Sequence, residues 1–384
     1  MNLLACGVVF VACQTVPNQP SDVSVSLAPL VELHNVPALA VLVLRGEAVV
    51  AQGVAGVRVS GRGEKATLAD LWHLGSCTKS MTATMIGTFV EEGRVSWAST
   101  IGEGLADVEP MDPGWKPVTV EQLLAHRAGV PADLRQGGLW SKLWNLTTPP
   151  RDQRGVLVAA ILAKPPLSAP GTQKLYANAG FTLAAAFVER AADKPWEDLM
   201  QERLFRPLGI TSAGFGAPGK PGEWTQPRGH DAAGKPVEPG PNHAGDNPAS
   251  IGPGGTVHMS LPDWGKYVSL HLAGERGTST LLKPETLRTM HTPYDAPGSD
   301  YGYGWSITRR GWAGGRVLTH GGSNTLWMAV VWVAPEKNMA VLAVCNRGGT
   351  PGDRACDEAV GEMVRSFVEK EPPVARVDSP ASPE

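Results

Sequence analysis

The sequence predicts an α+β fold, in which an antiparallel β-sheet is flanked by helices and carries an inserted, mainly helical lobe. Three observations lead to this prediction. Apolar runs of strand length occur near both ends of the chain, at residues 38–56 and 304–344, whereas apolar residues at helical spacing fill the middle. Gly (45) and Pro (33) are abundant, which argues against a helical bundle. The two groups of strands most simply form one sheet, with the helical segment inserted between them.

The first expected elements are a short helix at about 26–33 and a β-hairpin. Two Val-rich runs flank Arg45-Gly46-Glu47, which is a hairpin signal. A helix is expected over 77–92, because Met81, Met85, Ile86 and Val90 recur at helical spacing and Gly93 follows as the terminating residue.

The middle of the chain is expected to be helical. Thr119-Val120-Glu121-Gln122 forms a capping box that opens a helix ending near residues 126–129. Further helices are expected at 156–163, 179–192 and 196–205. Residues 214–255 are crowded with Gly, Pro and Asn, and they predict a long surface excursion that can cover a site.

The C-terminal part is expected to return to strands. A helix should follow Ser260, with Asp263 as a carboxylate of its first turn. The expected strands lie at 304–308, 316–319, 326–333 and 339–344, and a final helix at 357–370. The domain should therefore span 26–370, with its sheet part at about 26–80 and 256–370 and its lobe and loop at about 81–255. Residues 371–384, rich in Pro, Ser and charge, predict a disordered tail.

The N-terminus suggests export. Leu3 to Ala12 form an apolar run that is too short to span a bilayer but fits the core of a secretory signal. Residues 1–13 are therefore expected to be a signal, and 14–25 a linker. Val11-Ala12 before Cys13 resembles a lipoprotein cleavage site, which predicts a lipid anchor at Cys13 and an exported, periplasmic or membrane-anchored protein. If the N-terminus is not a signal, since it lacks Lys and Arg, the protein is expected to be cytoplasmic.

Composition narrows the classes of partner. The formal net charge is -3 and no basic block occurs, so a nucleic-acid partner is not expected. The five cysteines form no CxxC pair and the nine histidines are scattered, so neither a metal nor another cofactor is expected. Cys345 and Cys356 can pair in an exported protein, although two separate buried thiols are the favoured interpretation.

The stretch LGSCTKS places a serine at the head of a helix and a lysine three residues later. Residues at this spacing lie on the same helix face, so Lys79 can remove the proton of Ser76 or stabilise the negative charge that develops there. The alternative is that Ser76 only caps the helix and Lys79 is solvated.

Two further segments carry candidate chemistry. In PGTQKLYANAGF, Tyr176 can shuttle a proton and Asn178 can donate to and accept from a substrate amide or Lys79. In RVLTHGGSNT, the glycines of His320-Gly321-Gly322 let a substrate lie close to an edge strand, and the N–H of Ser323 can form an oxyanion hole with that of Ser76.

Together, Ser76-Cys77-Thr78-Lys79, Tyr176-Ala177-Asn178 and His320-Gly321-Gly322 resemble the motifs of the serine β-lactamase and penicillin-binding superfamily, in the same order. The chain looks most similar to class C β-lactamase-related serine hydrolases over about residues 33–368. The resemblance implies a β-lactamase/transpeptidase-like fold and acyl transfer. Ser76 would be acylated, Lys79 and Tyr176 would share the proton transfers, and Asn178, His320, Gly321, Gly322 and Ser323 would bind the substrate or the oxyanion.

One departure from the family pattern bears on the substrate. β-Lactamases and peptidases of the superfamily that the chain resembles usually carry K-T-G where this chain has His320-Gly321-Gly322, and their lysine grips the substrate carboxylate. Histidine is largely neutral at pH 7, so strong β-lactam hydrolysis is not expected. Family members with H-x-G at this place include esterases, amidases and D-amino-acid peptidases. The resemblance therefore implies a serine hydrolase of esters, amides or D-peptides, on a small-molecule or cell-wall-peptide-like substrate. A penicillin-binding D-Ala-D-Ala carboxypeptidase or a β-lactamase is the enzymatic alternative, and a non-catalytic binding or scaffold protein the alternative of another class.

An α/β-hydrolase is a rejected alternative, because it would need G-x-S-x-G, which Gly75-Ser76-Cys77 does not satisfy.

Several other residues are expected to be structural. His126 should pack and hydrogen-bond, Cys77 should be a small buried hydrophobe, and Trp305 should belong to the core.

Overall fold

The computed structural model describes residues 19–240 and 245–374. Within them, seven strands form one sheet in the order β1-β3-β2-β12-β11-β10-β9. Every pairing is antiparallel except that of β1 with β3. The strands are β1 (Ser21–Asp22), β2 (Ala38–Arg45), β3 (Ala48–Gly56), β9 (Ser306–Arg310), β10 (Gly315–Gly322), β11 (Met328–Ala334) and β12 (Met339–Cys345). Because β2 pairs with β12, the two strand groups meet in one sheet, as predicted.

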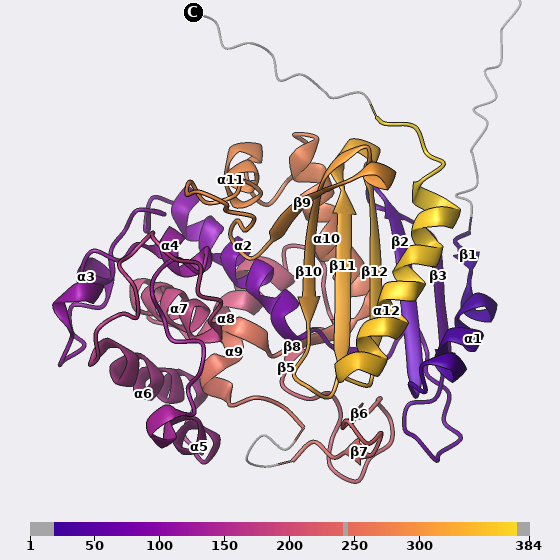
Figure 1. Cartoon of the computed structure of the whole chain (residues 1–384), viewed down its shortest axis with the longest axis horizontal. Helices are drawn as coiled ribbons and strands as arrows, with labels where there is room; N and C mark the ends of the chain where they lie inside the picture. Colours follow the sequence, from indigo (N-terminus) through magenta and orange to yellow (C-terminus); the bar gives the residue numbers. More distant parts are fainter. Residues whose placement is uncertain (1–18, 241–244, 375–384) are drawn as a thin grey trace, which may run out of the picture.

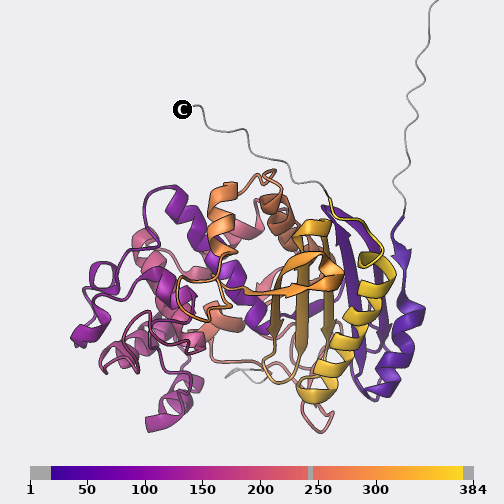
Figure 2. The ribbon, with the colours of Figure 1, turned by 45° about the horizontal axis from the view of Figure 1, so that its top comes forward.

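The two faces of the sheet are covered by different helices. Figures 1 and 2 show α12 (Gly349–Met363) and α1 (Ser24–Leu33) on one face. The other face packs against α10 (Leu261–Glu275). Strand β2 is apolar along its whole length because both of its faces are buried. Leu39, Val41 and Val43 lie in the core under α12, and the alternate residues lie in the larger core shared with the lobe.

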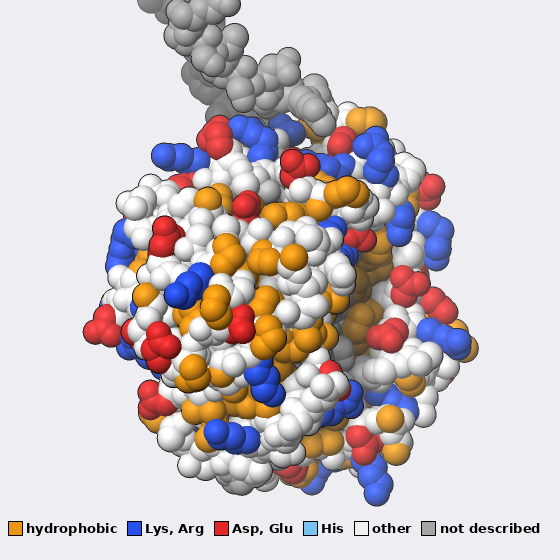
Figure 3. Space-filling model, turned by 60° about the vertical axis from the view of Figure 1, so that its left-hand side comes forward, with side chains coloured by type: hydrophobic (Ala, Val, Ile, Leu, Met, Phe, Trp, Pro, Cys, Tyr) orange, Lys and Arg blue, Asp and Glu red, His pale blue; other side chains and the backbone are white. Residues whose placement is uncertain are grey.

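The helical lobe lies beside the sheet, and its central helix is α2 (Thr78–Glu91), which is buried along almost its whole length. The other helices that follow α2, up to α11, are α3 (Ile101–Gly104), α4 (Val120–Leu124), α5 (Leu139–Trp144), α6 (Pro150–Leu162), α7 (Asn178–Ala192), α8 (Trp196–Met200), α9 (Gly252–Gly255) and α11 (Pro284–Met290). The predicted capping box is confirmed: Thr119 and Gln122 cap α4 reciprocally. The face of the lobe in Figure 3 is hollowed, and hydrophobic side chains gather beside the hollow.

A second, small sheet joins the lobe to the region that precedes α2. It consists of β4 (Leu71–His73), β8 (Val257–Ser260) and β5 (Gly214–Phe215), and a separate hairpin is formed by β6 (Gly229–His230) and β7 (Pro236–Val237). Strand β4 ends directly before the turn that contains Ser76, so this sheet fixes where α2 begins.

Three expectations need correction. Helix α12 begins at Gly349 rather than near 357, because its first turns lack the apolar periodicity that reveals a helix. Residues 214–255 are not simply a surface excursion, since buried polar side chains anchor them, among them Arg228 and Asp246. The first residues of the expected tail are ordered, since Glu371 pairs with Arg45 and Val374 donates to Glu336 O.

Several expectations cannot be judged from the described residues. The predicted signal, Cys13 and the end of the tail lie outside them. Across residues 19–240 and 245–374, every helix is too short or too polar to cross a membrane.

Candidate active site

Ser76 lies in a single 3-10 turn, Gly75–Cys77, that leads into α2. The turn is in backbone contact with the end of β10. Gly75 has a φ of +49°, and a Cβ on it would lie 2.3 Å from the backbone N of Ser323. A Cβ on Gly322 would lie 2.0 Å from Leu74 O. Only glycine permits so close an approach, and it brings the N–H groups of Ser76 and Ser323 to one place.

Lys79 is fully buried, one turn further along α2. Its Nζ lies 3.0 Å from Ser76 Oγ, 2.6 Å from Asn178 Oδ1 and 2.6 Å from Gly254 O. All three partners are uncharged, so the loss of hydration outweighs the opposing effect of Cys77, and burial lowers the pKa of Lys79 to about 7. The amine is therefore available as a base near neutral pH.

Asn178 and Gly254 come from two separate helices that meet over Lys79. Asn178 is the first residue of α7, and Gly254 belongs to the glycine-rich helix α9. A Cβ on Gly254 would lie 2.9 Å from Asn178 O, so the carbonyl that accepts from Lys79 reaches its place only with glycine there.

Tyr176 borders the same space. Its ring centroid lies 4.8 Å from Lys79 Nζ, and its phenol is near enough to Ser76 for the Ser76 hydroxyl to lower the pKa of Tyr176 slightly. Although the residue is 42% exposed, desolvation raises the pKa of Tyr176 to about 12. The phenol is therefore protonated at neutral pH and suited to donate its proton.

His126 supports the backbone on both sides of Tyr176. Its Nδ1 accepts from the N–H of Ala177 at 3.2 Å and its carbonyl oxygen accepts from the N–H of Leu175 at 2.8 Å. The two ring centroids lie 4.2 Å apart. This packing and hydrogen-bonding role is the one expected from the sequence.

His320 is buried, and both ring nitrogens have partners. Nδ1 donates to Gly321 O at 2.7 Å, which leaves Nε2 to accept from the hydroxyl of Tyr301 at 2.8 Å. Burial and the nearby charge of Lys79 lower the pKa of His320 to about 3. The ring is therefore neutral, and it offers no positive charge to a substrate.

The remaining singled-out residues are structural. Cys77 is buried with its Sγ 3.6 Å from His320 O, and burial raises its pKa to about 12, which makes it a poor nucleophile. Cys345 and Cys356 are free, buried thiols. Trp305 lies in the core, and Asp263 is in the first turn of α10. No cluster of metal-ligating side chains occurs among residues 19–240 and 245–374.

Sequence reasoning missed several residues of the site. Gly254 accepts from Lys79 and Tyr301 contacts His320. His73 contacts the turn that contains Ser76, Asp246 contacts His73, and Asn324 contacts Asp246. For His73 the sequence holds a local signal, namely its nearness to Gly75 in WHLGS. For Asp246, in a segment without periodicity, the sequence holds no comparable signal.

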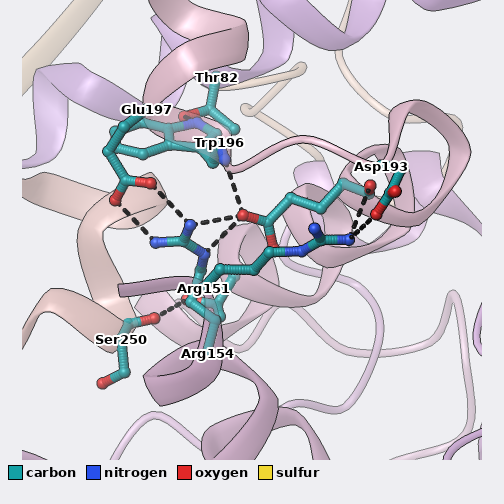
Figure 4. Close-up of polar contacts among 9 residues, drawn as sticks. Thr82, Arg151, Arg154, Asp193, Trp196, Glu197 and Ser250 are labelled. Carbon is teal, nitrogen blue, oxygen red and sulfur yellow. Dashed lines mark hydrogen bonds and ion pairs between the residues drawn. The ribbon is translucent and has the colours of Figure 1, made fainter. Parts of the chain in front are cut away.

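A buried charged cluster lies among α6, α7 and α8, and Figure 4 shows Arg154 and Glu197 of this cluster. Arg154 on α6 donates to Glu189 on α7 and to Glu197 on α8. The cluster reaches the site through Trp196, whose Nε1 donates to Thr82 Oγ1 at 3.2 Å, and Thr82 in turn donates to Pro253 O at 2.8 Å. Pro253 directly precedes the glycine that accepts from Lys79.

Comparison with known proteins agrees with this geometry. A family model described as Beta-lactamase matches residues 26–363. The chain is 24% identical over 332 residues to the D-alanyl-D-alanine-carboxypeptidase/endopeptidase AmpH of Escherichia coli K12, covering 81% of this chain and 80% of that protein. It is 27% identical over 337 residues to the lovastatin esterase of Penicillium rubens, covering 73% and 80%. Among solved structures, the octameric penicillin-binding protein homologue from Pyrococcus abyssi superposes with a TM-score of 0.72 at 23% identity, covering 89% of this chain and 77% of that one.

Proposed function

The chain belongs to the Beta-lactamase family, and from that premise we propose that it is a serine hydrolase of esters, amides or D-peptides with Ser76 as its nucleophile. The observation that carries the proposal is the contact of Lys79 Nζ with Ser76 Oγ at 3.0 Å, made by an amine whose pKa burial lowers to about 7. A nucleophile with a matched base in hydrogen-bond reach is the arrangement that acyl transfer requires.

In the acylation step, neutral Lys79 accepts the proton of Ser76 as its Oγ attacks the carbonyl carbon. The negative oxygen of the tetrahedral intermediate lies between the N–H groups of Ser76 and Ser323. Protonated Tyr176 then donates to the leaving oxygen or nitrogen, the bond to the leaving group breaks, and the acyl group remains on Ser76. The proton that Lys79 holds restores Tyr176.

In the deacylation step, water attacks the ester of Ser76 and gives a proton to the same pair of residues. The acid is released and Ser76 recovers its proton. Asn178 keeps Lys79 in place in both steps through the 2.6 Å contact.

The preferred substrate is proposed to lack a carboxylate at the position that the family's lysine usually grips. Support comes from His320, whose low pKa leaves the ring neutral, and whose nitrogens are already occupied by Tyr301 and Gly321. An ester or D-amino-acid amide fits this site, and β-lactam hydrolysis should be weak.

A D-Ala-D-Ala carboxypeptidase acting on cell-wall peptides is the second candidate. It is favoured by the similarity to the AmpH protein over 81% of the chain. Export to the periplasm, with or without a lipid anchor at Cys13, is proposed from the apolar run of residues 3–12 alone. The mass of the mature N-terminal peptide from native cells tests it, since an unprocessed Met1 would contradict export.

The test compares the purified protein with Ser76→Ala on p-nitrophenyl butyrate, D-alanine p-nitroanilide, nitrocefin and labelled penicillin. We expect ester or D-amide turnover that falls by at least about 10³-fold in Ser76→Ala, with little loss of nitrocefin. Ser80→Ala is the matched control, because Ser80 lies on the same helix and its Oγ donates to Cys77 O. Stable penicillin labelling without turnover would favour the carboxypeptidase, and turnover that survives in Ser76→Ala would contradict the proposal.

A further inference from the structure

A buried carboxylate, Asp246, joins the two segments that carry the oxyanion donors. It lies in the segment between β7 and α9 and is 7% exposed. Its Oδ1 lies 2.8 Å from His73 Nε2 and accepts from Asn324 Nδ2 at 3.1 Å. His73 is three residues before Ser76, and Asn324 directly follows Ser323.

His73 transmits the contact to the turn that contains Ser76. The N–H of Gly75 donates to His73 Nδ1 at 3.1 Å, so the ring proton is on Nε2, the nitrogen that faces Asp246. The carboxylate oxygen faces this nitrogen at 2.8 Å, so its negative charge favours this tautomer and this orientation of the ring. Without it, the ring is free to rotate or change tautomer and to release the N–H next to Ser76.

Asn324 transmits the contact to the other donor. Its Nδ2 also donates to Gly245 O at 3.1 Å, and its Oδ1 accepts from the N–H of Leu326 at 3.2 Å. Between them Thr325 has a φ of +77°, which is strained for a β-branched residue and persists only where the surroundings impose it. The side chain of Asn324 is thus part of what holds the strained loop after Ser323.

We propose that Asp246 is a positioning residue for the oxyanion hole, because it holds the backbone N–H groups of Ser76 and Ser323 in register through His73 and Asn324. The inference rests on the proposed function. Since the two donors come from segments almost 250 residues apart in sequence, their separation depends on tertiary contacts, and Asp246 contacts both sides. It touches neither the substrate nor the reacting atoms.

The test measures ester hydrolysis and inhibition by phenylboronic acid, which forms a tetrahedral anionic adduct with an active serine. Asp246→Ala should lower kcat by about 10- to 10²-fold, approaching the effect of losing an oxyanion donor. It should weaken the binding of phenylboronic acid by a similar factor. KM should change less than twofold, because the ground state depends less on these donors. Asp246→Asn, which keeps an acceptor oxygen of the same shape, should recover most of the loss.

Two further variants keep the test decisive. Asn324→Ala removes only the contact between Asp246 and the loop after Ser323. It should also lower kcat, so it replaces Asp246→Ala if that variant does not fold. Asp263→Asn is the matched control, since Asp263 is also a buried carboxylate that anchors a loop, through the N–H groups of Thr211 and Ser212. Its kcat per folded molecule should equal that of the wild type.

The outcomes separate this inference from the proposed function. Serine-dependent turnover by the wild type establishes the function first. If turnover is present but Asp246→Ala lowers only the melting temperature, with kcat per active site and phenylboronic acid affinity unchanged, the positioning role is overturned. If the wild type shows no Ser76-dependent turnover, the proposed function fails, and phenylboronic acid affinity still reports on the oxyanion hole.

Discussion

Arg154 and Lys79 are both fully buried cations, and they differ in what surrounds them. Arg154 lies between the carboxylates of Glu189 and Glu197 (Figure 4). Although burial alone lowers its pKa, the two carboxylates outweigh burial and raise it. Lys79 contacts only neutral oxygens, and burial lowers its pKa to about 7. The difference indicates that the charge of the partners, more than burial, decides whether the pKa of a buried cation is raised or lowered.

The two clusters are also connected. Trp196 is adjacent to Glu197 in sequence, and its Nε1 donates a hydrogen bond to Thr82. Thr82 in turn donates a hydrogen bond to the carbonyl of Pro253. The charged cluster thus helps to fix the backbone that presents Gly254 O to Lys79.

The largest effect on activity is expected when Lys79 is replaced by arginine, which stays charged near neutral pH. Lys79→Arg keeps the cation but removes the base, because guanidinium does not lose its proton near neutral pH. We expect ester hydrolysis, measured as kcat/KM at pH 7.5, to fall by about 10³-fold, within the range for loss of a general base.

The matched control for that variant is Lys337→Arg. Lys337 is buried and donates to the carbonyls of Val368 and Glu369, far from Ser76 in the sheet layer. Its kcat/KM should stay within twofold of the wild type. More than a tenth of the activity remaining in Lys79→Arg would contradict the assignment of Lys79 as the base.

The next effect concerns stability. Arg154→Met leaves Glu189 and Glu197 without their buried cation, which should lower the free energy of unfolding by about 3–5 kcal/mol. Urea denaturation measures the change. Arg135→Gln, which removes an exposed pair with Asp133, should lower the free energy of unfolding far less, because water screens the pair. Equal losses in the two variants would show that the carboxylates are not held by Arg154 as the structure indicates.

Much of the fold could be predicted from the sequence because it is recorded in local patterns. The apolar run of β2 and the spacing of Ser76 and Lys79 on one helix face are examples, and the structure has both. The start of α12 at Gly349 escaped prediction because GTPGDRACDE lacks an apolar stripe, so contact with the sheet decides it.

The site was predictable only in part, for a related reason. Ser76 and Lys79, the proposed nucleophile and base, are close in sequence, whereas the residues that contact each of them come from distant segments of the chain. The contact of Asn178 with Lys79, 99 residues away, is confirmed as predicted, whereas Gly254, 175 residues away, was not predicted. Asp246 lies in a segment without periodicity, and its role emerges only from its contacts with His73 and Asn324.

The smallest and most diagnostic effect is a shift in pH dependence. Asn178→Asp places a carboxylate 2.6 Å from Lys79 Nζ, which gives the lysine a partner of the kind that Arg154 has. An opposite charge at this distance raises the pKa of a cation by about 1–3 units. The rising limb of activity should therefore move to higher pH in this variant.

The pH profile of kcat/KM for p-nitrophenyl butyrate, between pH 5 and 10, tests the central claim most directly. Because deprotonated Lys79 is the active form, the profile of the wild type should rise through an apparent pKa of about 7 and then level. In Asn178→Asp the same limb should lie at least one unit higher. A flat wild-type profile, a limb near the ordinary lysine pKa of about 10, or an unmoved limb in Asn178→Asp would contradict the account.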